Sequence, residues 1–172
     1  MNMDWDEKQF SEFILDNEII GFFQDPLKLK SGRMSYWYVN WRNVAEDVYL
    51  MDNLTDFVIS FVKELSLEPD CFYGVPEGAT KLGVLTQYKW GMSHSPNKDD
   101  FVLSMGRGKP KTHGAPKDKY FLGVPRGNVI ILEDVTTTGG SLIESIKNLK
   151  DLNVNIISAI GLTNRNELRK DG

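Results

Sequence analysis

The segment from Val129 to Ser141 constrains the fold more than any other part of the chain. Four apolar residues predict a buried strand, and two adjacent acids, Glu133 and Asp134, follow it. A run of threonines and two glycines then leads into a helix. A strand, a flexible turn and a helix N-terminus form an anion site, because free amides point outward and the helix dipole adds positive potential. The neighbouring acids suit a ligand that carries both phosphate and hydroxyl groups.

The composition excludes several classes of protein. The chain has 172 residues, which is enough for one domain with a real core. A formal charge of −4 argues against general nucleic-acid binding, and no apolar run approaches the roughly 18 residues of a membrane helix. The single cysteine, Cys71, rules out an intrachain disulfide and fits a reducing compartment. We therefore expect a cytoplasmic protein whose partners include neither nucleic acid nor membrane.

Apolar spacing along the chain predicts strands that alternate with helices. We expect an N-terminal helix over 5–17, an antiparallel hairpin over 22–44, helices over 48–65, 80–88 and 141–149, and strands over 71–75, 101–105, 129–132 and 154–162. Such alternation predicts βαβ units and a parallel sheet, with ligands at the carboxyl ends of the strands. The expected fold is α/β: a parallel sheet flanked by helices, with a small N-terminal hood. We expect a single domain, with the hood at about 1–45 and the core at about 46–172.

A long basic loop is predicted over residues 106–128. It holds five glycines, three prolines and six Lys or Arg against one acid. Arg107, Lys109, Lys111 and His113 lie close together in it, and such a cluster can neutralise a concentrated anion. The glycines would let the loop open and close as a lid. A solvated basic loop or a nucleic-acid patch is an equally open interpretation of the composition.

The predicted hairpin places a lysine among aromatic residues. Lys30 precedes Tyr36, Trp37, Tyr38 and Trp41. A flat anionic base would fit such a site, because the ammonium group meets a carboxylate and the aromatic walls exclude water. Ordinary hairpin packing is the alternative explanation of the aromatic residues.

The acid pair, the threonine-rich turn and the Gly-Gly pair resemble, in order and register, the phosphoribosyl-pyrophosphate signature of the type I phosphoribosyltransferases. The resemblance implies that Glu133 and Asp134 contact the ribose hydroxyls. It also implies that the 5′-phosphate is held by the turn: Thr136, Thr137, Thr138, Gly139, Gly140 and Ser141. Helix capping is an alternative role for Thr137 and Ser141, and it is compatible with phosphate binding.

Two further motifs resemble the orotate phosphoribosyltransferases within that group. Residues 29–35 read Leu-Lys-Ser-Gly-Arg-x-Ser, and the basic loop carries an Arg–Lys–Lys–His arrangement that ends in His-Gly. The resemblance implies a homodimer in which this lid reaches the neighbour's active site. Lys111 would be the main catalytic cation, with His113 and Arg107 beside it. Gly108 stands where many members have a lysine, and Lys109 is the candidate substitute.

The same resemblance assigns the base pocket. Lys30 and Arg165 would contact orotate, and the backbone near Tyr38 and Val39 would line the base. Residues 74–79 resemble the pyrophosphate-binding loop, where Glu77 is an unexpected acid.

The implied reaction converts orotate and phosphoribosyl pyrophosphate to orotidine 5′-phosphate and pyrophosphate. Asp134 would assist it, and Mg²⁺ would be held mainly by the substrate, so no protein metal site is predicted. Two alternatives stay open: a phosphoribosyltransferase for another nucleobase, such as a purine, and a non-enzymatic regulator that binds phosphoribosyl pyrophosphate.

Overall fold

The fold is built on a three-stranded parallel sheet. The computed structural model describes residues 4–28, 32–95, 97–109, 111–113 and 119–166. In it, β3 (Cys71–Gly74) pairs with β6 (Asn128–Thr136), and β6 pairs with β7 (Asn155–Asn164). The residues from Val129 to Leu132 are fully buried, as expected of a parallel strand that is covered on both faces.

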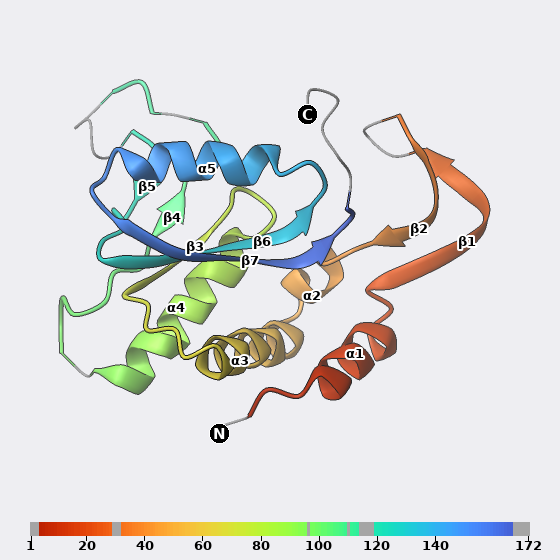
Figure 1. The fold of residues 1–172 in the computed structure, drawn as a ribbon, viewed down its shortest axis with the longest axis horizontal. Coiled ribbons are helices and arrows are strands. Elements are labelled where there is room, and N and C mark those ends of the chain that lie inside the picture. Colours follow the sequence, from red (N-terminus) through yellow and green to blue (C-terminus); the bar gives the residue numbers. More distant parts are fainter. Residues whose placement is uncertain (1–3, 29–31, 96, 110, 114–118, 167–172) are drawn as a thin grey trace.

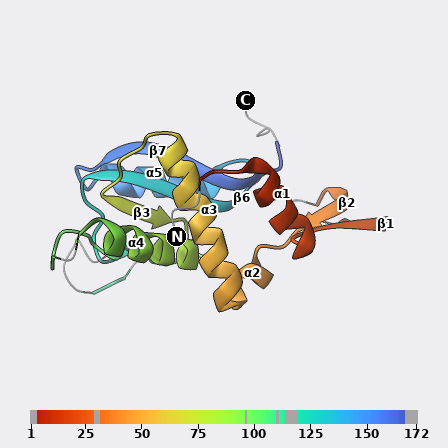
Figure 2. The same cartoon turned by 90° about the horizontal axis from the view of Figure 1, so that it is seen from below.

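Helices cover both faces of this sheet (Figures 1 and 2). α5 (Gly140–Lys150) lies on one face, and α3 (Val48–Glu64) and α4 (Thr80–His94) lie on the other. Successive strand residues point to opposite faces. Ile130 and Leu132 therefore join the cluster with α3 and α4, while Ile131 joins the cluster with Leu149 of α5. The predicted α/β fold, a parallel sheet flanked by helices, is confirmed.

α3 forms where its apolar spacing predicts a helix. Asp47 caps its N-terminus by accepting hydrogen bonds from the amides of Tyr49 and Leu50, both at 2.9 Å. Its buried apolar positions recur at helical spacing: Met51, Leu54, Val58 and Val62. The cap and the apolar stripe together fix where the helix starts and which way it faces.

α4 is longer than predicted, because it continues to His94 rather than ending near residue 88. The side chain of Gln87 accepts a hydrogen bond from the backbone amide of Phe72 at 2.8 Å. The indole of Trp90 donates to the carbonyl of Pro69 at 3.1 Å. These bonds anchor the second half of the helix to the segment around β3, and local sequence spacing gives no sign of them.

An antiparallel hairpin stands beside the sheet (Figure 1). It consists of β1 (Ile20–Lys28) and β2 (Met34–Val39), with an irregular register between Phe22 and Leu27. α1 (Glu7–Asp16) precedes it and the short α2 (Arg42–Glu46) follows it. The hairpin prediction is confirmed, although its predicted end lies in α2. The boundary between a hood and a core at about residue 45 stays a prediction.

The prediction of a third parallel strand over 101–105 was wrong. The short strand β4 (Met105–Gly106) pairs antiparallel with β5 (Phe121–Leu122), in a separate two-stranded sheet. Phe101 instead packs on α4, where a Cβ added to Gly91 would lie 3.2 Å from the Cβ of Phe101. Phe101 therefore covers a helix, and the segment does not extend the parallel sheet.

Candidate active site

A cavity of about 450 Å³ lies between the end of the hairpin and the carboxyl ends of β6 and β7. We call it the hairpin–sheet cavity. The following residues line it: Tyr38, Val39, Asn40, Trp41, Arg42, Pro76, Gly78, Glu133, Asp134, Val135, Thr137, Ser141 and Arg165. Parallel strands end at one edge of their sheet, and ligands of such folds bind there.

The acid pair lies in the wall of this cavity. Glu133 is buried, with 7% of its surface exposed, and Asp134 is half-buried. The strand does not end before the pair, as predicted, but continues through Thr136. Both acids nevertheless line the cavity. The carboxylate of Asp134 accepts a hydrogen bond from the amide of Val135 at 2.8 Å, which fixes its direction.

The two acids differ in their electrostatics. Burial, and after it the charge of Asp134, raises the pKa of Glu133 from 4.5 to about 7. Near neutral pH a share of Glu133 therefore carries a proton. A protonated carboxyl can donate a hydrogen bond as well as accept one, so this wall can pair with hydroxyl groups in either direction.

The turn after β6 leads into the N-terminus of a helix beside the cavity. Gly139 has a φ of 74°, which favours glycine, and α5 begins at the next residue. Thr137 and Ser141 line the cavity. Thr136 ends β6, Thr138 and Gly139 lie in the turn and Gly140 begins α5, and these four residues are not among those that line the cavity in the described part of the chain. The free amides at the start of α5 add positive potential beside the acid pair.

Arg165 lines the hairpin side of the cavity together with Tyr38 and Val39. Its guanidinium carbon lies 4.9 Å from the ring centre of Trp37 and 6.0 Å from that of Tyr38. Its Nη1 is buried and has no hydrogen-bond partner among the described residues. A buried charged donor without a partner is costly, so this atom is poised for an acceptor that enters the cavity. Lys30, predicted to act with Arg165, lies outside the described residues.

The loop after β3 closes the cavity from a third side. A Cβ on Gly74 would overlap the carbonyl of Ala79, and a Cβ on Gly78 would overlap the carboxylate of Asp134. Only glycine allows the loop to pass so close to these groups. The peptide bond between Pro76 and Glu77 is cis. This loop therefore lies directly against the acid pair.

The described residues of the basic loop lie outside the lining of this cavity. Arg107, Lys109, Lys111 and His113 are not among the residues that line the cavity in the described part of the chain. Backbone bonds from Arg107 to Tyr120 and from Lys111 to Lys119, both of 2.8 Å, extend the β4–β5 ladder. Figure 1 shows β4 and β5 on the side of the core away from the hairpin. The base of the loop comes near the cavity, because Gly108 lies against the carboxylate of Glu77.

Sequence reasoning assigned no role to Asn40 and Arg42, which line the hairpin side of the cavity. Trp41, which was considered as a possible aromatic wall, lines the same side. Pro76 and Gly78 belong to residues 74–79, which were predicted from the resemblance to be a pyrophosphate-binding loop, and both line the cavity. Arg42 gave no signal in the sequence, because a charged residue at the start of a short helix is most often only a surface charge.

Comparisons with known proteins define first the fold and then the family. No protein-family model matches the chain. The solved orotate phosphoribosyltransferase from Aeropyrum pernix superposes with a TM-score of 0.69 at 21% identity, covering 92% of this chain and 83% of that one. The fold is thus that of the type I phosphoribosyltransferases.

Two curated relatives establish the family. The orotate phosphoribosyltransferase of Bradyrhizobium diazoefficiens is 32% identical over 153 residues, covering 85% of this chain and 77% of the relative. That of Aquifex aeolicus is 30% identical over 143 residues, covering 81% and 73%. The chain belongs to the orotate phosphoribosyltransferase family.

Proposed function

We propose that this protein is an orotate phosphoribosyltransferase, a pentosyltransferase of de novo pyrimidine (UMP) synthesis. It joins orotate to the ribose of phosphoribosyl pyrophosphate and releases pyrophosphate. The observation that carries the proposal is that one cavity combines an acid pair, a helix N-terminus and the buried Nη1 of Arg165, which has no hydrogen-bond partner among the described residues. These three features match the hydroxyl, phosphate and carboxylate groups of the two substrates.

The sugar phosphate occupies the sheet side of the cavity in this proposal. The 5′-phosphate lies on the amides and hydroxyls of residues 136–141, and the ribose hydroxyls pair with Glu133 and Asp134. When pyrophosphate leaves, positive charge develops near the anomeric carbon. The carboxylate of Asp134 stabilises that charge from a fixed position, and a fixed charge needs no reorganisation during the step. The ring nitrogen of orotate then bonds to that carbon from the opposite side, and the proton that this nitrogen carried passes to the departing pyrophosphate.

Orotate occupies the hairpin side. Its carboxylate would accept hydrogen bonds from the guanidinium of Arg165, which is a charge-assisted and geometrically specific pairing. Stacking on Trp37, at 4.9 Å, holds the guanidinium plane in place. A neutral purine offers no carboxylate to this atom, so the arrangement favours orotate. Lys30 would add a second cation to the same side.

Mg²⁺ fits this site as a substrate-held ion. Glu133 and Asp134 offer hard oxygen donors, whereas no group of ≥ 3 His, Cys, Asp or Glu gathers as a metal site among the described residues. Mg²⁺ characteristically takes one or two carboxylates and completes its shell with phosphate oxygens and water. When bound, it would neutralise charge on the leaving pyrophosphate.

The remaining cations would come from the lid of a second copy. Lys111 and His113 are exposed and stand apart from the cavity of their own chain. A homodimer in which each lid serves the neighbour's cavity would bring them to the pyrophosphate, and closure would exclude water. Arg107 and Lys109 would assist.

No helix in the described ranges is both long and apolar enough to cross a membrane. We place the enzyme in the cytoplasm, without a nucleic-acid partner.

The deciding experiment follows the loss of orotate absorbance. Purified protein, phosphoribosyl pyrophosphate and Mg²⁺ should consume orotate, and turnover should collapse in Lys111→Ala but persist in the control Lys147→Ala on α5. Adenine and other bases should give no product. Binding of phosphoribosyl pyrophosphate without turnover of any base would contradict the proposal and indicate a regulator, whereas turnover of a purine would indicate a different base.

A further inference from the structure

Arg42 lines the hairpin–sheet cavity, yet the proposed reaction gives it no task. Its side chain is exposed. Its backbone amide donates to the Oδ1 of Asn40 at 3.2 Å, but no hydrogen bond or ion pair joins its guanidinium to another residue that the structure describes. An arginine side chain offers five donors and is always charged in proteins. The cavity therefore holds a second arginine whose donors the described neighbours leave unused.

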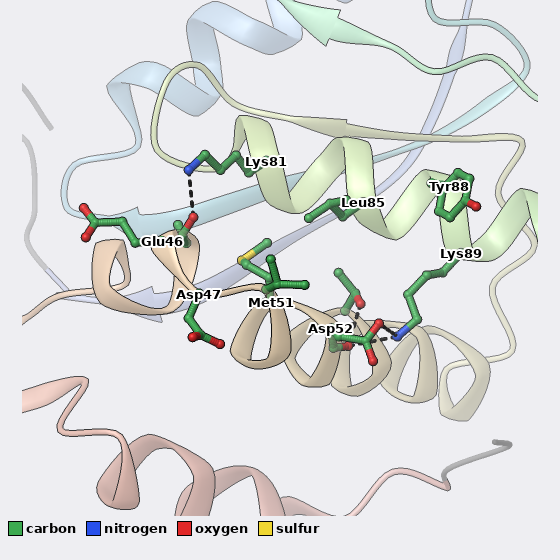
Figure 3. Close-up of a pocket in the computed structure, with 11 residues that line it drawn as sticks. Glu46, Asp47, Met51, Asp52, Lys81, Leu85, Tyr88 and Lys89 are labelled. Atoms are coloured by element: carbon green, nitrogen blue, oxygen red, sulfur yellow. Dashed lines mark hydrogen bonds and ion pairs between the residues drawn. The ribbon is translucent and has the colours of Figure 1, made fainter.

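The backbone on both sides of Arg42 is held in place. The indole of Trp41, just before α2, donates to the hydroxyl of Thr163 near the end of β7 at 3.0 Å. The ammonium group of Lys81, in the first turn of α4, donates to the carbonyl of Ala45 in α2 at 2.8 Å, and Figure 3 shows this bond. The start of α2 is thus tied to β7 and its second half to α4. A side chain on so well supported a segment is suited to hold a ligand in one position.

The bond between α2 and α4 places Arg42 beside the loop at 74–79. α4 begins at Thr80, directly after this loop, so a helix that is tied to the first turn of α4 lies next to the loop. Pro76 and Gly78 of the loop line the same cavity as Arg42. The resemblance of residues 74–79 assigns the pyrophosphate to this loop. Arg42 therefore shares a cavity wall with the segment that the pyrophosphate would contact.

The loop at 74–79 offers the pyrophosphate no cation of its own. Its one charged residue is the acid Glu77, which is not among the described residues that line the cavity. Position 78 has no room for a longer side chain, because a Cβ on Gly78 would overlap the carboxylate of Asp134. The loop can therefore offer backbone amides only. A pyrophosphate group concentrates several negative charges, so cations from other segments are needed to balance it.

The charges of the cavity assign Arg42 by elimination. Among the described residues of its lining, the cations are Arg42 and Arg165, and the acids are Glu133 and Asp134. In the proposed function, Arg165 pairs with the carboxylate of orotate, the start of α5 holds the 5′-phosphate, and the acids face the ribose. The pyrophosphate is then the one anionic group without a cation from this lining. The lid cations would reach it only on closure, whereas Arg42 already lines the cavity of its own chain.

We propose that Arg42 is a substrate-binding residue that holds the pyrophosphate group of phosphoribosyl pyrophosphate within its own chain, before the lid closes. The proposal rests on the proposed function, because it takes this cavity to bind that substrate. It goes further by adding a residue of α2 to a group whose other cations come from the lid. The planar guanidinium can donate to two phosphate oxygens at once, and it stabilises the charge that builds up there as the pyrophosphate leaves.

Calorimetry with inorganic pyrophosphate and Mg²⁺ tests this contact directly. Arg42→Ala should raise the Kd for pyrophosphate about tenfold to a hundredfold, because a charge-assisted pair of hydrogen bonds is lost. Arg42→Lys keeps the charge but not the planar fork, so it should raise the Kd by less. Ribose 5-phosphate should bind the wild type and both variants equally. The control Lys98→Ala removes a cation that is 92% exposed and outside the lining of the cavity, and it should change neither affinity.

Steady-state kinetics gives a second readout. In Arg42→Ala the KM for phosphoribosyl pyrophosphate should rise, while the KM for orotate should stay unchanged. Far-ultraviolet circular dichroism should show an intact fold, because the side chain is exposed and alanine favours a helix. A rise in the KM for orotate alone would assign Arg42 to the base and overturn the proposal. Unchanged pyrophosphate binding in Arg42→Ala would overturn it too, as would a wild type that binds no pyrophosphate.

The two assays separate this proposal from the proposed function. If the wild type turns over orotate while Arg42→Ala binds pyrophosphate normally, the function stands and the role of Arg42 fails. If the wild type turns over no base, yet Arg42→Ala loses affinity for pyrophosphate and keeps it for ribose 5-phosphate, the contact stands and the function fails.

Discussion

The parallel sheet and the hairpin are both β structures, yet the chain covers them very differently. Residues Val129–Leu132 of β6 are fully buried, whereas Phe22 and Tyr36 on the hairpin are 77% and 61% exposed. β6 has a strand on each side, while β1 and β2 have only each other among the described strands. The acid pair therefore lies on a strand that the core buries. The opposite wall of the cavity lies on the hairpin, which its own chain leaves largely exposed.

The two regions meet at the end of β7. The indole of Trp41 donates to the hydroxyl of Thr163 at 3.0 Å, and Arg165 stacks on Trp37. These contacts, rather than a shared ladder, set the distance between the two walls of the cavity. The comparison teaches that the sheet side of the cavity rests on the buried core, whereas the hairpin side is held by a few side-chain contacts across a gap.

The largest effect on stability should come from shortening a buried side chain of the parallel sheet. Ile131→Ala should lower the free energy of unfolding by about 2–5 kcal/mol, because it leaves a cavity between β6 and α5. Tyr36→Ala on the hairpin should change it by less than about 0.5 kcal/mol. Denaturant unfolding of both variants measures the contrast. Equal losses would show that the hairpin is as well supported as the sheet.

The largest effect on kcat should come from Asp134, on the sheet side of the cavity. Asp134→Asn keeps the shape of the side chain but removes its charge, so kcat should fall on the order of 10²-fold. The control Asp151→Asn, at the exposed end of α5, should leave kcat unchanged. Steady-state kinetics with orotate and phosphoribosyl pyrophosphate measures both. If the two variants behaved alike, the charge of Asp134 would have no part in the reaction.

A third test concerns pH and the buried member of the acid pair. The pKa of Glu133 is raised to about 7, so the folded state holds this proton more tightly than the unfolded state does. The free energy of unfolding should therefore fall as pH rises from about 4.5 to about 7, and stay lower above it.

Glu133→Gln has no such proton, so its free energy of unfolding should not show this fall. The difference in free energy of unfolding between the variant and the wild type should therefore grow, in favour of the variant, by about 2 kcal/mol from about pH 5 to about pH 8. Urea unfolding at the two pH values measures this gain. Parallel curves for the two proteins would mean that the pKa of Glu133 does not shift on folding.

The smallest effect should come from changing Arg165, which links the end of β7 to the hairpin. Arg165→Lys keeps the charge but loses the planar donor that stacks on Trp37, so the KM for orotate should rise about tenfold with little change in kcat. The KM for phosphoribosyl pyrophosphate should be unaffected. An equal rise in both KM values would mean that Arg165 supports the whole cavity and does not select the base.

The elements with regular apolar patterns could be read from the sequence. The buried strand before Glu133, the apolar stripe of α3 and the hairpin follow from local spacing. The acid pair and the turn into α5 follow from their order along one segment. The length of α4 could not be predicted, because Gln87 and Trp90 bond to residues far away in the chain. The segment 101–105 looked like a parallel strand because an apolar run gives no sign of whether it will pair or cover a helix.

The sequence by itself determined the α/β class, the family and the chemical groups of the site, because these depend on residue types in a fixed order. The tertiary structure decided which of those groups share a cavity. It placed Arg165 on Trp37 and left its Nη1 without a partner in the part of the chain that the structure describes. It also buried Glu133 enough to raise its pKa, and it left Lys111 and His113 outside the lining of the cavity of their own chain. Distances between distant segments and exclusion of water arise only when the chain is packed, so no local pattern carries them.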